Sequence, residues 1–260
     1  MRPGARPQLQ DRKANRDFGW NEEDAGRALK MNRQRLEELQ FKLYADGRFP
    51  VLVVLQGIDG GGKDGTIRHV ITAFNPQGCT VTSFKAPTAQ ELRHDYLWRI
   101  HQHIPARGEI AVFNRSHYED VLIVRVDKLV PHAVWSRRYE EINNFERMLA
   151  ANEVRIVKFF LHISKDEQRK RFAARVRDPA KQWKFDVADL DKRKQWDAYR
   201  KAYEAMLAQC STEWAPWYLI PADRKWFRNL AISQILVQEL AKLPLRFPKP
   251  AYDPTKIRIK

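Results

Sequence analysis

The fold is decided by residues 51–66, which read VLVVLQGIDGGGKDGT. Val51–Leu55 form an uninterrupted apolar run rich in β-branched residues, typical of a strand buried on both faces of a parallel sheet. In the glycine-rich turn that follows, Gly57, Gly62 and Lys63 satisfy the first seven positions of G-x-x-x-x-G-K-[ST]. The buried strand before this turn, and a helix predicted near residues 66–74, favour a phosphate-binding loop over a turn without a ligand.

The composition of this loop suits an anion. Glycine lets the backbone wrap closely around a phosphate group and turn several N–H groups inward. The amino end of the following helix adds its dipole, and Lys63 adds a mobile positive charge. We therefore expect phosphate or nucleotide to be bound by Gly57, Gly60, Gly61, Gly62, Lys63, Asp64, Gly65 and Thr66.

The loop departs from the motif at its eighth position. Asp64 stands where a serine or threonine hydroxyl would hold Mg²⁺. A carboxylate there would face phosphate oxygens, which argues against the ordinary way of binding a nucleoside triphosphate. Asp59, inside the loop, offers an alternative oxygen ligand for a hard cation.

The rest of the chain alternates strands and helices, which predicts βαβ units and a parallel sheet. Further strands are predicted at 80–84, 110–113, 154–163 and 217–220, and helices at about 21–47, 88–103, 131–150, 164–176, 189–208 and 224–242. We predict an α/β protein with a P-loop kinase fold: a parallel five-stranded sheet flanked by helices, with a helical lid. The expected parts are an N-terminal arm (1–20), the kinase domain (21–242) with its lid (165–205), and a proline-rich tail (243–260).

Composition bounds the partners and the compartment. The 260 residues carry a formal net charge of +15, and 43% of them are hydrophobic. Global disorder is therefore excluded, and an anionic partner is expected: nucleic acid, an acidic membrane surface or a polyanionic small molecule. The two cysteines form neither a disulfide framework nor a zinc motif, and no apolar run is long enough for a membrane span or a secretory signal. These features predict a cytoplasmic protein.

A second polar cluster follows the predicted strand at 110–113. In many phosphate-loop enzymes an acid ends this strand and binds Mg²⁺, and Asn114 occupies that place here. Arg115 can bind two phosphate oxygens at once, and Glu119 and Asp120 follow closely. The residues alone leave two interpretations open: a functional loop beside the phosphate loop, or a hydrogen-bonded turn that begins the next helix.

Together these segments resemble the polyphosphate kinase 2 family. The resemblance rests on GIDGGGKDGTIRHV at 57–70 and FNRSHYEDVLIVRV at 113–126. It continues through KAPT at 85–88, HIPARG at 103–108, DP at 178–179, WKF at 183–185 and WDAYRKAYE at 196–204, and spans roughly residues 25–240. The HYED version of the second motif, residues 117–120, is similar to the branch that phosphorylates both AMP and ADP.

The resemblance implies an activity and roles for residues. Family members transfer a phosphoryl group reversibly from inorganic polyphosphate to nucleotides, with Mg²⁺ or Mn²⁺, as dimers or tetramers, and their phosphate loop tolerates Asp after the lysine. By carry-over, Asp59 and Asn114 would lie at the metal and acceptor site, and Lys63 and Arg115 would bind the phosphates being transferred. Glu119 would help to hold metal or acceptor. The expected catalytic residues are thus Asp59, Lys63, Asn114, Arg115, Glu119 and Arg171.

Basic residues outside the loop predict where polyphosphate binds. Residues 165–201 hold an excess of lysine and arginine, and the resemblance makes Arg171 the lid arginine that closes on phosphate. A solvated basic face is the alternative for most of these residues. The Asp178-Pro179 pair breaks the helix and suits a hinge. The predicted polyphosphate contacts are Arg68, Lys85, His117, Lys128 and Arg171.

Two other functions stay open. One is an ATP-dependent P-loop nucleotide kinase resembling thymidylate kinase, against which Asp64 and the excess positive charge argue. The other is a non-enzymatic basic module that binds nucleic acid. The complete phosphate loop argues against that module. We expect polyphosphate and adenine nucleotides as partners, without nucleic acid or membrane.

Overall fold

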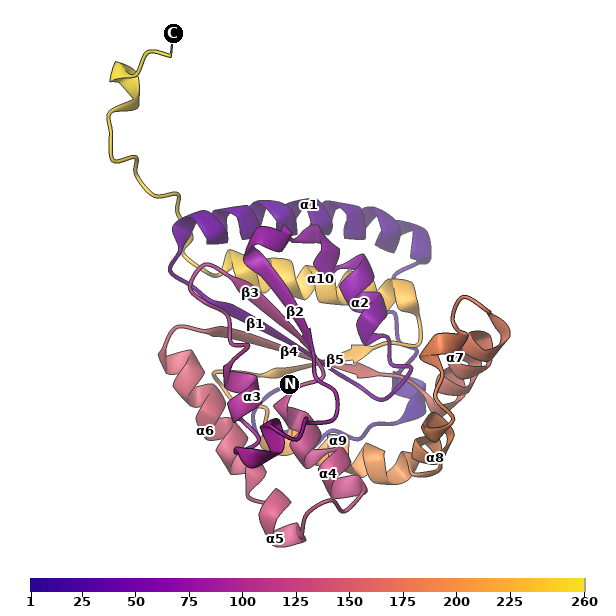
Figure 1. Ribbon diagram of the computed structural model, residues 1–260. Helices are drawn as coiled ribbons and strands as arrows, with labels where there is room; N and C mark the ends of the chain where they lie inside the picture. The colour runs from indigo at the N-terminus through magenta and orange to yellow at the C-terminus, as the bar shows by residue number, and fades with distance from the viewer. Residues whose placement is uncertain (260) are drawn as a thin grey trace.

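A five-stranded parallel sheet forms the centre of the protein (Figure 1). The computed structural model describes residues 1–259. The strands are β1 (Val51–Gln56), β2 (Cys79–Ser83), β3 (Ile110–Asn114), β4 (Arg155–His162) and β5 (Trp217–Pro221), in the order β2-β3-β1-β4-β5. The predicted P-loop kinase fold is confirmed, with β1 in the middle between β3 and β4.

Side chains of β1 alternate between two hydrophobic layers. Val51, Val53 and Leu55 pack with α1 (Glu22–Asp46) and α10 (Lys225–Ala241) on one face of the sheet. Leu52 and Val54 point to the other face, which α6 (Arg138–Ala151) and α9 (Trp196–Gln209) cover. Figure 1 shows these two layers above and below the sheet. Each fully buried Val or Leu side chain stabilises the fold by about 1.5–3 kcal/mol, so this strand fixes the scaffold from which the phosphate loop extends.

Several predicted helices are interrupted. The expected helix at 88–103 is reduced to a 3₁₀ turn (Glu91–Arg93) and α3 (Trp98–His101), because the Asp95 carboxylate accepts a hydrogen bond from the backbone N–H of Leu97 and competes with the helix. The expected helix at 131–150 divides into α5 (His132–Trp135) and α6, and that at 189–208 into α8 (Ala188–Lys194) and α9. The helix after the phosphate loop, α2, covers only Lys63–His69.

The predicted lid lies at the edge of the sheet where β4 and β5 end. It contains α7 (Lys165–Arg177), α8 and α9 as far as residue 205, and Figure 1 shows α7 and α8 standing beside the sheet. The Ser164 hydroxyl caps α7 by accepting from the backbone N–H of Glu167. We call residues 165–205 the lid segment.

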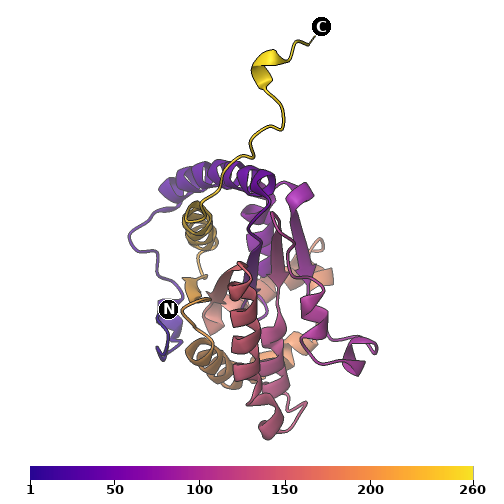
Figure 2. The same ribbon diagram turned by 90° about the vertical axis from the view of Figure 1, so that its left-hand side faces the viewer.

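The two ends of the chain behave differently. Leu9 and Ala14 in the N-terminal arm are buried, so the arm packs against the body. The segment after α10 first contacts α1, where the ring centroids of Phe247 and Phe41 lie 6.0 Å apart. Beyond this contact it leaves the body of the protein (Figures 1 and 2). The domain boundaries given above remain predictions. None of the helices in residues 1–259 has the length and hydropathy that crossing a bilayer requires.

Candidate active site

The phosphate loop and the loop after β3 meet at the carboxyl ends of β1 and β3. This edge lies at the switch point of the sheet, because the chain visits β2 and β3 on one side of β1 and then crosses to β4 on the other. The backbone N–H of Arg115 donates to Leu55 O, which joins the two loops. Gly57 lets the phosphate loop lie close against β4, because a Cβ there would lie 2.9 Å from the carbonyl oxygen of Leu161.

Lys63 points back into its own loop. Its Nζ donates a hydrogen bond to the carbonyl oxygen of Gly57 at 2.6 Å, and its side chain is buried. Burial, together with the nearby charge of Arg115, lowers the pKa of Lys63 to about 8, while Asp59 opposes the shift. The buried Lys63 ammonium is not fully neutralised by its neighbours, so binding an anion in the loop would stabilise it.

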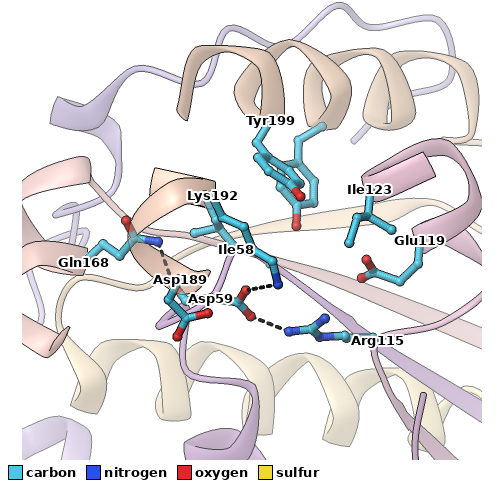
Figure 3. A pocket seen from close by; sticks show the side chains of 11 residues that line it. Ile58, Asp59, Arg115, Glu119, Ile123, Gln168, Asp189, Lys192 and Tyr199 are labelled. Carbon is cyan, nitrogen blue, oxygen red and sulfur yellow. Dashed lines mark hydrogen bonds and ion pairs between the residues drawn. The ribbon is translucent and has the colours of Figure 1, made fainter. Parts of the chain in front are cut away.

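Asp59 lies between two cations. Its carboxylate pairs with Arg115 and lies 3.5 Å from Nζ of Lys192, as Figure 3 shows. Burial alone would raise the pKa of Asp59, but the charges of Lys63, Arg115 and Lys192 outweigh it and hold that pKa below its ordinary value. Asp59 is therefore an anion at neutral pH.

A pocket opens between the two loops and the lid segment (Figure 3). Arg115, Glu119 and Ile123 line one side of it, and residues of the lid segment line the other. Its lining is Gly57, Ile58, Asp59, Arg115, Glu119, Ile123, Gln168, Asp189, Lys192, Tyr199 and Tyr203. The pocket thus combines two cations, three carboxylates and an apolar, aromatic surface.

The structure brings some of the predicted catalytic residues together but not all. Asp59, Arg115 and Glu119 share the pocket, and Lys63 lies behind Gly57. Asn114 does not line it. Its amide donates to the Asp64 carboxylate at 3.0 Å and to the Ser83 hydroxyl at 3.4 Å.

Arg171 does not have the environment expected of a mobile lid arginine. Its guanidinium is buried and donates to the carbonyl oxygens of Gly60, Gly61, Ala222 and Asp223, and to the Glu167 carboxylate. Contrary to the prediction that it closes on phosphate, Arg171 holds the phosphate loop against the ends of β5 and α7. With every one of its N–H directions used, it has none left for a ligand.

His117 also lies elsewhere than predicted. Its ring has no exposed surface, and Nε2 lies 3.2 Å from the buried Glu146 carboxylate on α6. This placement does not fit the expected contact with polyphosphate. The other predicted polyphosphate contacts, Arg68, Lys85 and Lys128, have exposed side chains, and their role stays a prediction.

Comparison with known proteins identifies the family. The model of the family described as Polyphosphate kinase 2 (PPK2) matches residues 20–246. The chain belongs to the polyphosphate kinase 2 family. The match includes both loops, the pocket and the lid segment.

Individual relatives of the polyphosphate kinase 2 family are similar over most of their length. A protein of Meiothermus ruber named AMP/ADP-polyphosphate phosphotransferase is 54% identical over 242 residues, which cover 93% of this chain and 91% of that protein. The ADP-polyphosphate phosphotransferase of Rhodopseudomonas palustris is 51% identical and covers 85% and 81%. The crystal structure of Polyphosphate Kinase 2 from Arthrobacter aurescens TC1 is 44% identical, with a TM-score of 0.90, and covers 93% of this chain and 88% of that one.

Sequence reasoning missed a basic residue beneath the loop of this polyphosphate kinase 2 family member. Arg228 on α10 is buried, and a Cβ at Gly62 would lie 2.0 Å from its Nη1 atom. Burial, together with the charge of Arg171, lowers the pKa of Arg228 to about 10. Nothing in the local sequence of α10 marks this arginine, because only the fold brings it to a loop more than 160 residues away.

The oxygen donors of the site suit a hard divalent cation. Asp59 is anionic, and Asp189 also lines the pocket. Asn114 at the end of β3 and Asp64 at the start of α2 form a second pair of oxygen-bearing side chains. These donors fit Mg²⁺ or Mn²⁺ and not zinc, which prefers histidine and thiolate. Within residues 1–259, no three His, Cys, Asp or Glu side chains already converge as a preformed metal site would require.

Proposed function

We propose that this protein transfers a phosphoryl group reversibly from inorganic polyphosphate to AMP and ADP, giving ADP and ATP. The observation that carries the proposal is the pocket in which Asp59, Arg115 and Glu119 meet beside a phosphate loop, in a chain of this family. The names of the relatives support polyphosphate as donor and both AMP and ADP as acceptors.

The residues act by positioning and by neutralising charge. Phosphoryl transfer needs no covalent intermediate on the protein, so stabilising the charge on the equatorial oxygens provides most of the catalysis. Lys63 and Arg115 supply that positive charge from two loops that are joined through their backbones. Asp59 orients Arg115 through their ion pair until substrate takes its place.

A divalent cation, Mg²⁺ or Mn²⁺, is part of the proposal. Asp59 would hold it, with Asn114 close by at the end of β3. When bound, it would neutralise negative charge on the phosphate groups. Asp59 pairs with Arg115 and Lys192, so a cation held by Asp59 would lie beside the two basic side chains that we expect to bind phosphate.

Polyphosphate is proposed to run along the basic surface around the pocket. Lys192 already reaches into the pocket, and Lys184 lies 3.9 Å from Asp64. Arg68, Lys85 and Lys128 extend this surface with exposed charges. This arrangement accounts for the net charge of +15, because a polyphosphate chain is a dense polyanion that a basic surface attracts.

The test is a donor and acceptor assay on the purified protein. Polyphosphate with AMP, and polyphosphate with ADP, should each give the next nucleotide when Mg²⁺ is present, and EDTA should abolish the transfer. An ATP donor in place of polyphosphate tests the rival nucleotide kinase, and binding to nucleic acid with competing polyphosphate tests the basic module. Transfer from ATP alone would overturn the proposal.

The assembly and compartment are part of the same proposal. We infer a homo-oligomer, a dimer or a tetramer, that works in the cytoplasm without membrane or nucleic acid. Light scattering on the purified protein measures the assembly, and fractionation of the source cells measures the compartment. A monomer at assay concentration would contradict the first of these.

A further inference from the structure

Gln56 is the one amide in a strand that is otherwise apolar. It is the last residue of β1, pairs with Phe160 on β4 and has no exposed surface. A buried amide is unfavourable unless its N–H and C=O groups are bonded. An apolar residue would satisfy packing at this position, so the amide needs another reason.

Its partners form a directional chain across to the loop after β3. The Gln56 Nε2 atom donates to Glu119 Oε1 at 3.0 Å, and Gln56 Oε1 accepts from the Ser116 hydroxyl at 3.3 Å. The Ser116 oxygen accepts in turn from the backbone N–H of Tyr118 at 3.2 Å. An ionised carboxylate only accepts hydrogen bonds, so Glu119 fixes which way the amide points.

We propose that Gln56 is a positioning residue that holds the Glu119 carboxylate at the acceptor-nucleotide side of the pocket. The inference rests on the proposed function, since it assigns Glu119 to hydrogen-bond donors of the nucleoside. Ile123 beside Glu119, and Tyr199 and Tyr203 on the lid segment, also line the pocket and offer an apolar, aromatic surface for that nucleoside. Figure 3 shows Glu119 next to Ile123, with Tyr199 nearby.

The geometry explains why both ends of the amide matter. One end fixes a carboxylate oxygen, and the other fixes Ser116, which begins the 3₁₀ turn η5 (His117–Val121) that carries Glu119. The phosphate loop starts at the very next residue, Gly57. Gln56 thus fixes the position of the acceptor side of the pocket relative to the loop that binds the transferred phosphate.

The experiment compares Gln56→Leu with a matched control, Gln40→Leu. Gln40 is also a buried glutamine, but it lies on α1, where its Oε1 accepts from the backbone N–H of Asn75 at 3.3 Å, outside the pocket. For each variant, kcat and the KM values for AMP, ADP, polyphosphate and Mg²⁺ are measured, with the melting temperature.

We expect Gln56→Leu to raise the KM for AMP and ADP by about tenfold, with a smaller change in the KM for polyphosphate, because one hydrogen bond to a charged group is lost. Gln40→Leu should lower only the melting temperature. A second variant, Gln56→Glu with Glu119→Gln, reverses the direction of the hydrogen bond and should leave acceptor binding weak, because position 119 then lacks its carboxylate. Equal changes in all KM values, or a change confined to Mg²⁺, would overturn the assignment.

A crystal structure of Gln56→Leu gives a readout that does not depend on activity. The Glu119 carboxylate should leave its place beside residue 56 if the amide holds it, and an unmoved carboxylate would overturn the inference even in an active enzyme. Failure of the wild-type protein to use polyphosphate would instead count against the proposed function. The two failures are therefore distinguishable.

Discussion

The loop after β3 and the lid segment face each other across the pocket, but different interactions hold them. Behind the loop, Lys158 and Glu146 form an ion pair of 2.5 Å between side chains with no exposed surface, and Tyr118 bonds to both. In the lid segment, pairs such as Arg169 with Asp166 are mostly exposed to solvent. A buried pair without its partner is costly, whereas exposed pairs contribute little.

The pocket therefore has a fixed wall, formed by the loop after β3, and a weakly held wall, formed by the lid segment. The loop carries Arg115 and Glu119 on an anchored base, as preorganised charge stabilisation requires. The exposed ion pairs of the outer lid segment contribute little to stability, so we propose that this part moves when the site closes over polyphosphate. Arg171 belongs to the fixed part, because it bonds from the middle of α7 to carbonyl oxygens of the phosphate loop.

Lys63→Ala should show the largest effect on the fixed side. Removing the ammonium that lies within the phosphate loop should leave the fold intact and lower kcat by about 10²–10⁴-fold, equivalent to roughly 3–5 kcal/mol of transition-state stabilisation. Steady-state kinetics and circular dichroism measure the two. Lys30→Ala, which removes an exposed lysine on α1, is the control and should behave as wild type. A folded, fully active Lys63→Ala protein would refute the role of the loop.

Lys158→Met tests whether the anchored wall depends on its buried pair. Leaving Glu146 buried without its ammonium should lower the free energy of unfolding by about 3–5 kcal/mol, and Lys158→Met with Glu146→Leu should recover most of that loss. Urea denaturation measures both variants. If Lys158→Met were as stable as wild type, the buried ion pair would not anchor the loop after β3 more firmly than the exposed pairs hold the lid segment.

The pH dependence of kcat/KM sharpens the same contrast. The pKa of Lys63 is about 8, so its charge is present below that pH and is lost as the pH rises through it. We therefore expect kcat/KM to fall at pH values above about 8, while kcat, which reports the complex with bound phosphate, falls only at higher pH. The folded pKa lies below the unfolded one, so this group makes the fold more stable as the pH rises from about 8 to about 10. If kcat and kcat/KM began to fall at the same alkaline pH, this would contradict the expectation.

Local sequence patterns were enough for the scaffold and for one wall of the site. The apolar run at 51–55 and the glycine spacing after it predict β1 and its loop, because both features act within a few residues. The motif at 113–120 correctly predicts that Arg115 and Glu119 lie beside that loop. These predictions need only the rule that parallel strands end at one edge of the sheet.

Long-range contacts account for what the sequence did not predict. Arg171 and Arg228 meet the loop glycines from α7 and α10, and no periodicity in either helix distinguishes them from solvated arginines. His117 lies among polar neighbours in the sequence, yet its partner Glu146 is 29 residues further along and also buried. Which basic residues face a ligand is therefore a property of packing and not of composition.

Lys192→Ala should show the smallest effect and tests the weakly held wall. Lys192 is a cation of the lid segment that reaches into the pocket, because its Nζ lies 3.5 Å from the Asp59 carboxylate. Losing one partly exposed cation should raise the KM for polyphosphate by about two- to fivefold, equivalent to less than about 1 kcal/mol, and make that KM less sensitive to salt. The KM for AMP or ADP should change less.

Lys194→Ala is the matched control on the same helix. Lys194 pairs with Asp191 at 2.7 Å and is mostly exposed, so its loss should leave both KM values and their salt dependence unchanged. The two variants remove the same charge from α8 and differ only in whether that charge reaches the pocket. Equal effects of the two would mean that polyphosphate is sensitive to the overall charge of the lid segment, and that closure requires no specific contact at Asp59.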